Sequence, residues 1–160
     1  MSQADCQLDD FHFTRLAVRW YPPNESGHIE IEYGFDYKVG RHKTEKDRYR
    51  LAFTVSAKSS TPEPIGYLLD SEIVGFFRFP EGIDQKKADY LIRVNGCAIL
   101  YGILRGQVAN LTGNFPQKKL LLPSLMMREV VDGVEKQKEA QRKLKKPASK
   151  APKAASVKKV

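Results

Sequence analysis

The sequence is poor in the residues that build metal sites, disulfide frameworks and membrane spans. Its 160 residues include two cysteines, three histidines and one tryptophan, and no window holds 18 or more uninterrupted apolar residues. Cys6 and Cys97 lie far apart and match no metal-ligand spacing, so we expect free thiols rather than a disulfide, and no metal or cofactor. The absence of long apolar runs excludes a transmembrane helix. The N-terminal stretch MSQADCQLDD is polar and acidic, so we expect no signal peptide and a cytoplasmic protein.

Sequence motifs that carry catalysis are also missing. No Gly-rich phosphate loop and no G-x-S-x-G nucleophile elbow occur, since Gly102 and Gly106 lie inside a helical pattern. The acidic pair Glu30 and Glu32 falls at solvent-facing positions of a predicted strand, and His42 falls in a charged loop. We therefore expect a binding protein and no enzyme.

The whole net charge of +8 is confined to the C-terminal end. Residues 135–160 hold ten Lys or Arg and two Asp or Glu, whereas the preceding part holds 17 of each sign and is neutral. The end of this stretch is rich in Lys, Ala and Pro, so we expect a disordered basic tail. Such a tail serves solubility, or it binds polyanions by counterion release. A nucleic-acid or ribosome-associated protein is therefore the alternative interpretation of the sequence.

Period-two alternation predicts four strands in the first half of the chain. Residues 28–39 and 49–58 place β-branched and aromatic side chains on one side and polar ones on the other, with a charged loop between them. An earlier strand changes phase midway, which predicts a β-bulge near Thr14 or Arg15. The last strand is apolar on both sides in its second half, so we expect both faces to be covered there. The four strands are expected at 11–21, 28–39, 49–58 and 65–79.

A helical period takes over after the fourth strand. Asp84 is suited to cap a helix over residues 85–112, in which Gly96 is expected to cause a kink or break. A second helix is expected to start near Ser124 and to lose its apolar face past Gly133. This order predicts an α+β fold, a four-stranded antiparallel sheet with two C-terminal helices on one face. The expected organisation is an N-terminal tail over 1–8, a domain over 9–134 and the basic tail over 135–160.

Gly102 and Gly106 form, with Ala109 and Gly113, a stripe of small residues on the first helix. Each glycine in a helix interior costs about 1 kcal/mol relative to alanine, so the stripe indicates a close approach of another backbone. That approach is either internal packing on the sheet or an interface with another subunit. The sequence pattern leaves both open.

The run LYGILRGQVANLTGNFPQKKLLLP, from Leu100 to Pro123, resembles the signature of SecB, a family of bacterial export chaperones. In that family the first helix carries an L-[FW]-P-Y-x-R-E motif, followed by a Gly-Phe-Pro segment and a leucine-rich run that ends in proline. Here Tyr101 stands at the aromatic position, Arg105 at the arginine and Phe115 at the Phe-Pro step. The order of four strands, a helix, a connecting segment and a second helix also agrees.

The sequence departs from the family pattern in several ways, one of which is that the segment before Phe115 is about two residues short. Gly102 replaces the usual proline of the motif, and Gly106 replaces its glutamate. SecB proper is acidic and docks the export motor SecA on its acidic sheet face, whereas the core of this chain is neutral. The resemblance therefore implies the fold and the client-holding role more strongly than it implies docking to SecA.

The resemblance implies a molecular chaperone, a holdase for unfolded or partly folded polypeptides in protein export or for a dedicated partner such as an antitoxin. Family members form homotetramers, dimers of dimers with first helices at the interface, which assigns Gly102, Arg105, Gly106 and Ala109 to that interface. They hold clients in apolar grooves between the sheet, the helix and the connecting segments. The client-binding residues expected here are Trp20, Tyr21, Phe76, Phe77, Phe79, Tyr101, Phe115, Leu120, Leu121 and Leu122.

Overall fold

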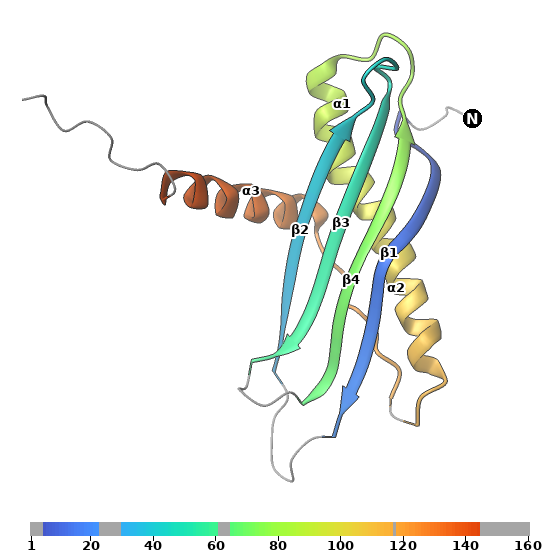
Figure 1. Ribbon diagram of the computed structural model, residues 1–160, viewed down its shortest axis with the longest axis vertical. Coiled ribbons are helices and arrows are strands. Elements are labelled where there is room, and N and C mark those ends of the chain that lie inside the picture. The colour runs from blue at the N-terminus through green and yellow to red at the C-terminus, as the bar shows by residue number, and fades with distance from the viewer. Residues whose placement is uncertain (1–4, 23–29, 61–64, 117, 145–160) are drawn as a thin grey trace, which may run out of the picture.

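A four-stranded antiparallel sheet carries its helices on one face (Figure 1). The computed structural model describes residues 5–22, 30–60, 65–116 and 118–144. The fold predicted from the sequence is confirmed. The elements are β1 (Gln7–Tyr21), β2 (Ile31–Arg41), β3 (Arg48–Ser59), β4 (Gly66–Arg78), α1 (Gln85–Leu91), the π-helical segment η1 (Ile92–Gly96), α2 (Cys97–Gly113) and α3 (Met127–Leu144).

The strand order is β1-β4-β3-β2, so β3 and β4 are central and β1 and β2 are the edges. The predicted bulge in β1 is present, because the register with β4 shifts between Phe13 and Arg15. One extra residue at this point keeps Phe13 and Leu16 on the same face of the sheet. Residues 28 and 29, expected to open the second strand, lie outside the described residues.

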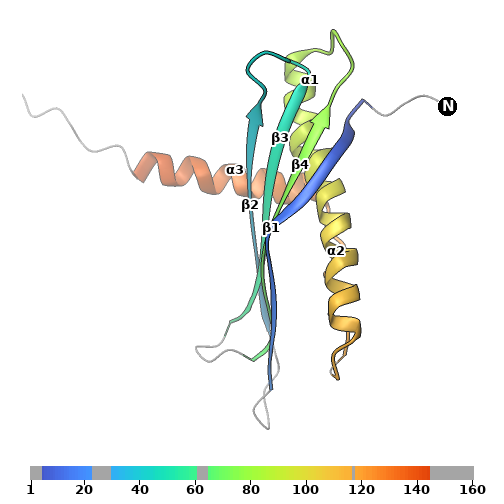
Figure 2. The ribbon, with the colours of Figure 1, turned by 45° about the vertical axis from the view of Figure 1, so that its right-hand side comes forward.

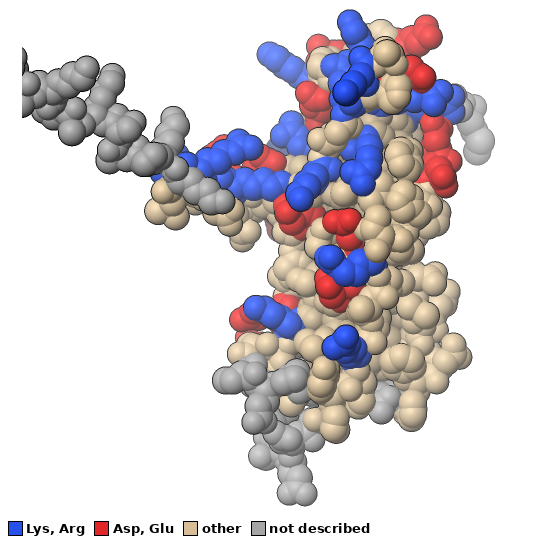
Figure 3. Space-filling model, in the orientation of Figure 1, with Lys and Arg blue, Asp and Glu red and all other residues tan. Residues whose placement is uncertain are grey.

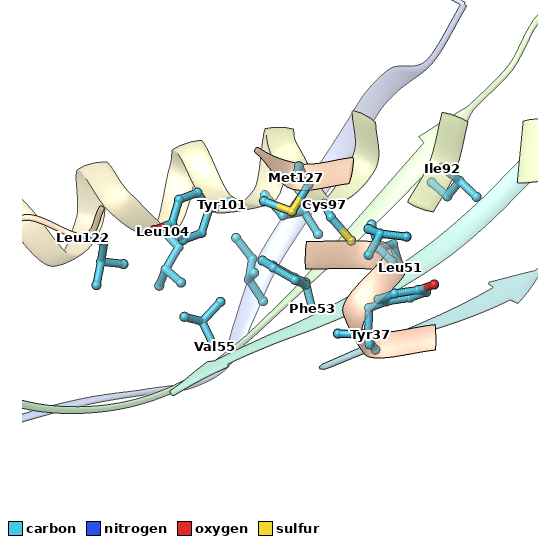
Figure 4. Packing of buried hydrophobic residues seen from close by; sticks show 14 of the residues in the cluster. Tyr37, Leu51, Phe53, Val55, Ile92, Cys97, Tyr101, Leu104, Leu122 and Met127 are labelled. Atoms are coloured by element: carbon cyan, nitrogen blue, oxygen red, sulfur yellow. The ribbon is translucent and has the colours of Figure 1, made fainter. Parts of the chain in front are cut away.

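The core lies between the inner face of the sheet, the face toward α2, and the helices. The alternation in β3 correctly predicted its inner side chains, which are all buried. Figure 4 shows Phe53 and Val55 of β3 pointing toward Tyr101 and Leu104 of α2, and Leu51 lying beside Cys97. Burying each large apolar side chain stabilises the fold by roughly 1.5–3 kcal/mol. The buried inner residues of β3 are Tyr49, Leu51, Phe53, Val55 and Ala57.

The first helical unit follows the sequence signals closely. The carboxylate of Asp84 accepts a hydrogen bond from the backbone N–H of Lys87 at 3.0 Å, which confirms the predicted cap. The predicted break appears as the π-helical segment, which ends at Gly96. A Cβ at Gly96 would lie 2.8 Å from a methyl carbon of Leu51, so glycine allows the helix to approach the sheet closely.

Helix α3 differs from the prediction at both ends. It begins at Met127, three residues after the expected start near Ser124. The expected tail boundary at Glu135 falls inside this helix, which continues to Leu144. In Figures 1 and 2, α3 crosses the β2 edge of the sheet and projects beyond it. Residues 145–160, the rest of the expected tail, lie outside the described residues.

Contacts with β2 explain why the helix persists past Glu135. The phenol of Tyr37 donates a hydrogen bond to the Glu135 carboxylate. The ammonium group of Lys138 donates to the Tyr37 carbonyl at 2.6 Å and pairs with Asp36 at 3.0 Å. Polar anchoring on the edge strand thus replaces the apolar face that the sequence loses after Gly133.

The outer face of the sheet is charged with both signs, as Figure 3 shows for its upper half. The second half of β4 places Val74 and Phe76 on this face. Val74 is fully buried, whereas Phe76 is 38% exposed. In the described part of the chain no helix lies on this face (Figure 2), so the expectation that both faces are covered holds for Val74 and not for Phe76.

At the N-terminal end, β1 begins at Gln7, so two residues of the expected N-terminal tail belong to the sheet. Leu8 packs against the core from this end of the strand. Among the helices that the structure describes, none has the length and apolar character needed to cross a membrane.

Candidate functional site

The helices cover the centre of the sheet and leave the inner faces of both edge strands partly open. Helix α2 packs on β3 and β4, whereas most inner side chains of β1 and β2 are only half-buried. Phe11 at one edge and Val39 at the other are 41% and 39% exposed. We call these side chains the β1 row, Phe11, Phe13, Leu16, Val18 and Trp20, and the β2 row, Ile31, Tyr33, Phe35, Tyr37 and Val39.

An aromatic cluster closes one end of the β1 row. The rings of Trp20 and Tyr67 lie 4.8 Å apart between centroids, and Phe115 stacks on Tyr67 at 6.3 Å. The phenol of Tyr67 donates to the carbonyl of Lys118 at 3.0 Å. Trp20 and its neighbour Tyr21 are half-buried, and Phe115 is 36% exposed. The sheet, the end of α2 and the connecting segment therefore meet at an aromatic surface.

Two residues of the SecB-like motif hold the connecting segment, residues 118–126, on α2. The phenol of Tyr101 donates to the carbonyl of Pro123 at 2.7 Å, and the guanidinium of Arg105 donates to that of Leu122 at 2.7 Å. Burial raises the pKa of Tyr101 to about 12, so the phenol keeps the proton that it donates. Arg105, expected at a subunit interface, thus has a partner within its own chain.

The connecting segment alternates between buried and exposed leucines. Leu120 and Leu122 are buried, whereas Leu121 between them is 66% exposed. The backbone N–H of Leu120 donates to the Thr112 hydroxyl at 2.9 Å, and that hydroxyl donates to the Val108 carbonyl at 2.8 Å. This extended geometry presents the Leu121 side chain to solvent.

The expected client-binding residues divide between core and surface. Phe77 and Phe79 belong to the core, and the Phe79 ring lies 5.2 Å from that of Tyr49. Phe76 lies on the opposite face, with its ring 5.9 Å from that of His12. The structure therefore does not bring the ten expected residues together in one surface. Trp20, Tyr21, Phe76, Phe115 and Leu121 keep exposed surface, whereas Phe77, Phe79, Tyr101, Leu120 and Leu122 are buried.

The glycine stripe of α2 is not used to pack the helix on its own sheet. A Cβ placed at Gly102 or at Gly106 would have no atom of the described residues within 4 Å. Ala109 is half-buried, and a Cβ at Gly113 would meet only the end of the Lys119 side chain, at 3.2 Å. Internal packing thus gives no reason for glycine at the first two positions.

The thiols are buried and poorly ionised. Burial raises the pKa of Cys6 to about 11 and that of Cys97 to about 12, which leaves almost no thiolate near neutral pH. Both cysteines are free, as the sequence predicted. Within the described ranges, no group of three or more His, Cys, Asp or Glu side chains is arranged to hold a metal ion. The chemistry that this surface offers is contact with apolar and aromatic groups.

Comparison with known proteins bears on the fold. The structure matches that of the Mycobacterium tuberculosis Rv1957 SecB-like chaperone, solved in complex with a ChAD peptide from the Rv1956 HigA1 antitoxin, with a TM-score of 0.59 and 16% identity over 76% of this chain and 91% of that one. The fold is SecB-like. A Streptococcus agalactiae protein of unknown function is also similar, with a TM-score of 0.43 and 9% identity over 77% of this chain and 100% of that one. No family model and no curated protein matches the sequence.

In this SecB-like fold, sequence reasoning missed most of the open surface. The alternation marked Tyr33 and Phe35, like Leu16 and Val18, as inward-facing, which predicts burial. They are half-buried because their strands are the edges of the sheet and α2 covers the centre. The signal that could have found them is strand order, which the pattern of a single strand does not contain.

Proposed function

We propose that this chain is a holdase chaperone that binds unfolded or partly folded polypeptides and catalyses no reaction. The observation that supports this most is the pair of apolar rows left half exposed at both edges of the sheet. A monomeric protein seldom leaves contiguous apolar rows open, and such surfaces bind chains with exposed apolar residues without reading their sequence. The similar fold of a SecB-like chaperone bound to an antitoxin peptide supports the same function.

The proposed contact surface is the exposed part of the site. It comprises the β1 row with Tyr21, the β2 row apart from the buried Tyr37, Phe115 and Leu121. The buried residues Tyr101, Leu120 and Leu122 shape it from beneath by holding the connecting segment in place. We propose that the chain works in the cytoplasm. Its clients are either polypeptides bound for export or one dedicated partner, such as an antitoxin.

The proposal includes a homotetramer, a dimer of dimers, in which α2 packs against a second copy. Gly102 and Gly106 support it, because a Cβ at either position would meet no atom of the described residues. Ala109 lies further along the same helix, and Arg105 is next to Gly106. Several weak sites on one assembly give the avidity that a disordered client requires. The outer sheet face carries both signs of charge, so we do not extend the proposal to SecA.

Suppression of aggregation tests the holdase function. We expect the full chain, at stoichiometric amounts, to keep a chemically unfolded client in solution, as measured by light scattering. Leu121→Ser should weaken client affinity about fivefold, because it removes roughly 1 kcal/mol of apolar contact. Leu144→Ser is the matched control, since Leu144 is 85% exposed on the projecting end of α3. Aggregation that proceeds unchanged in the presence of the chain would refute the proposal.

A second candidate function is binding to nucleic acid or to the ribosome through the basic C-terminal end. The observation that favours it is the confinement of the +8 net charge to residues 135–160. Polyanion binding of this kind falls steeply with salt. Deletion of the residues after Leu144 separates the two functions. The holdase function predicts that client binding survives the deletion, whereas the second candidate predicts that RNA affinity disappears.

A further inference from the structure

A basic cleft lies beside the β2 row, and its charged residues are not part of the client surface proposed above. Its volume is about 680 Å³, and its walls come from the end of β2, from α1 and η1, and from α3. Tyr37 and Val39 belong both to the β2 row and to this cleft. Val39 is exposed, whereas Tyr37 is buried under α3, so the cleft meets the proposed client surface at Val39.

The lining of the cleft is positively charged. Its five basic side chains are Lys38, Arg41, Arg93, Lys138 and Arg142, against the two carboxylates of Asp89 and Glu135. Both carboxylates already accept hydrogen bonds from neutral donors, Asp89 from Gln85 at 2.7 Å and Glu135 from the Tyr37 phenol. Burial, and then the bond to Glu135, raise the pKa of Tyr37, so this phenol remains a donor.

Two guanidinium groups in the cleft are available to a ligand. Arg93 uses its Nε to donate to the backbone carbonyl of Asp89 at 2.7 Å, which orients the group. Its terminal nitrogens, and the whole guanidinium of Arg142, make no hydrogen bond or ion pair to another described residue. Lys138 is paired with Asp36 at 3.0 Å, and the Nε of Arg41 donates to the Lys46 carbonyl at 2.9 Å. Arg142 therefore keeps more unused guanidinium donors than Arg41 does.

The backbone of the wall is irregular where it presents Arg93. This residue lies in the π-helical segment, and such segments are frequent at functional sites. The segment is fixed from below, because Ile92 is fully buried and Gly96 packs closely on Leu51. An oriented guanidinium on a rigid wall suits a carboxylate, which it can bind through two parallel hydrogen bonds.

We propose that this cleft binds carboxylate side chains of polypeptide clients, so that acidic residues next to an apolar stretch strengthen binding. This inference rests on the proposed function and names a preference within it. The apolar part of the client would contact the exposed Val39 of the β2 row, with an acidic side chain entering the cleft beside it. The shared lining and the complementary charge favour a peptide that is both apolar and acidic over a polyanion without apolar groups.

Fluorescence anisotropy with matched peptides tests this inference. The probes are an unstructured, labelled peptide with an aromatic and leucine-rich stretch followed by glutamates, and the same peptide with glutamines in their place. We expect the glutamate peptide to bind about fivefold more tightly to the full chain at low salt, and the difference to shrink as salt is added. Arg93→Gln and Arg142→Gln should each reduce the preference. Arg128→Gln, an exposed change on α3 away from the cleft, should leave it intact.

Several results would overturn the inference. One is equal affinity for the two peptides, and another is a preference that survives both substitutions. A third is competition in which single-stranded RNA displaces the labelled glutamate peptide at lower concentrations than the unlabelled glutamate peptide does, with this effect lost in the Arg93 and Arg142 variants. That result would identify a polyanion site. If the two peptides bind equally well to the natural chain and to every variant, the inference fails and the holdase function stands. If neither peptide binds, both fail. Arg142 is exposed, so its variant remains informative if Arg93→Gln impairs folding.

Discussion

Gly102 and Gly106 lie where glycine weakens the helix and improves no contact within the chain. Both are in the interior of α2, and a side chain at either position would meet no described atom. The sequence left internal packing and a subunit interface as equal alternatives. The open space at both positions removes the reason for the first and supports the second.

Replacing these glycines with alanine should have opposite effects on the stability of the folded chain and on its association with other copies. Gly102→Ala and Gly106→Ala should each stabilise an isolated α2 by about 1 kcal/mol, because alanine is the better helix former. In a close helix pair the added methyl groups should instead weaken association. Sedimentation over a range of concentrations measures this. The control is Gln107→Ala, because Gln107 is exposed and lies about 100° around the helix from Gly106. Variants that associate as tightly as the natural chain would exclude this face from the interface.

Cys97 gives the chain a dependence on alkaline pH. Burial raises its pKa from 9.0 to about 12, so the folded state keeps a proton that the unfolded chain loses. This group's contribution to stability is complete below pH 9 and is lost as the pH rises toward 12. Urea titrations of Cys97→Ala should show a shallower fall of unfolding free energy in that window. Parallel curves for the two proteins would contradict this assignment.

At the scale of elements, the sequence predicted what each strand and helix does alone and missed how they are placed together. The bulge near Arg15, the Asp84 cap and the break at Gly96 are local effects, and each is present. The strand order was not predicted, because alternation shows which face a side chain takes and not which strand lies beside it. The length of α3 was missed for a similar reason, since Tyr37 anchors it from a distant strand.

One buried hydroxyl aligns the connecting segment at Leu120. Thr112 is fully buried and accepts from the N–H of Leu120. Thr112→Val keeps the shape and removes the acceptor, which should cost about 1–3 kcal/mol and accelerate hydrogen exchange of the Leu120 amide. Thr112→Ser keeps the acceptor and should preserve that protection. Equal protection of the Leu120 amide in both variants would show that the segment is held by other contacts.

At the scale of the whole molecule, charge and apolar surface are separated. The part before Glu135 is neutral overall, and its open rows are apolar, whereas the +8 net charge belongs to the C-terminal end. Helix α3 joins the two, because it begins in the core at Met127 and ends beyond the sheet at Leu144. We therefore propose that the sheet and its edge rows hold clients, and that any polyanion contact belongs to the C-terminal end.

We propose that the half-buried edge rows hold unfolded polypeptide, and the fluorescence of Trp20 would respond directly to such binding. It is the only tryptophan of the chain and lies in the β1 row, half-buried against Tyr67. The decisive measurement is its fluorescence during titration with an unfolded polypeptide that lacks tryptophan. We predict a saturable blue shift and reduced quenching by iodide, and no change with the same polypeptide in its folded form. An emission spectrum that stays unchanged up to a large excess of the unfolded polypeptide would contradict the account.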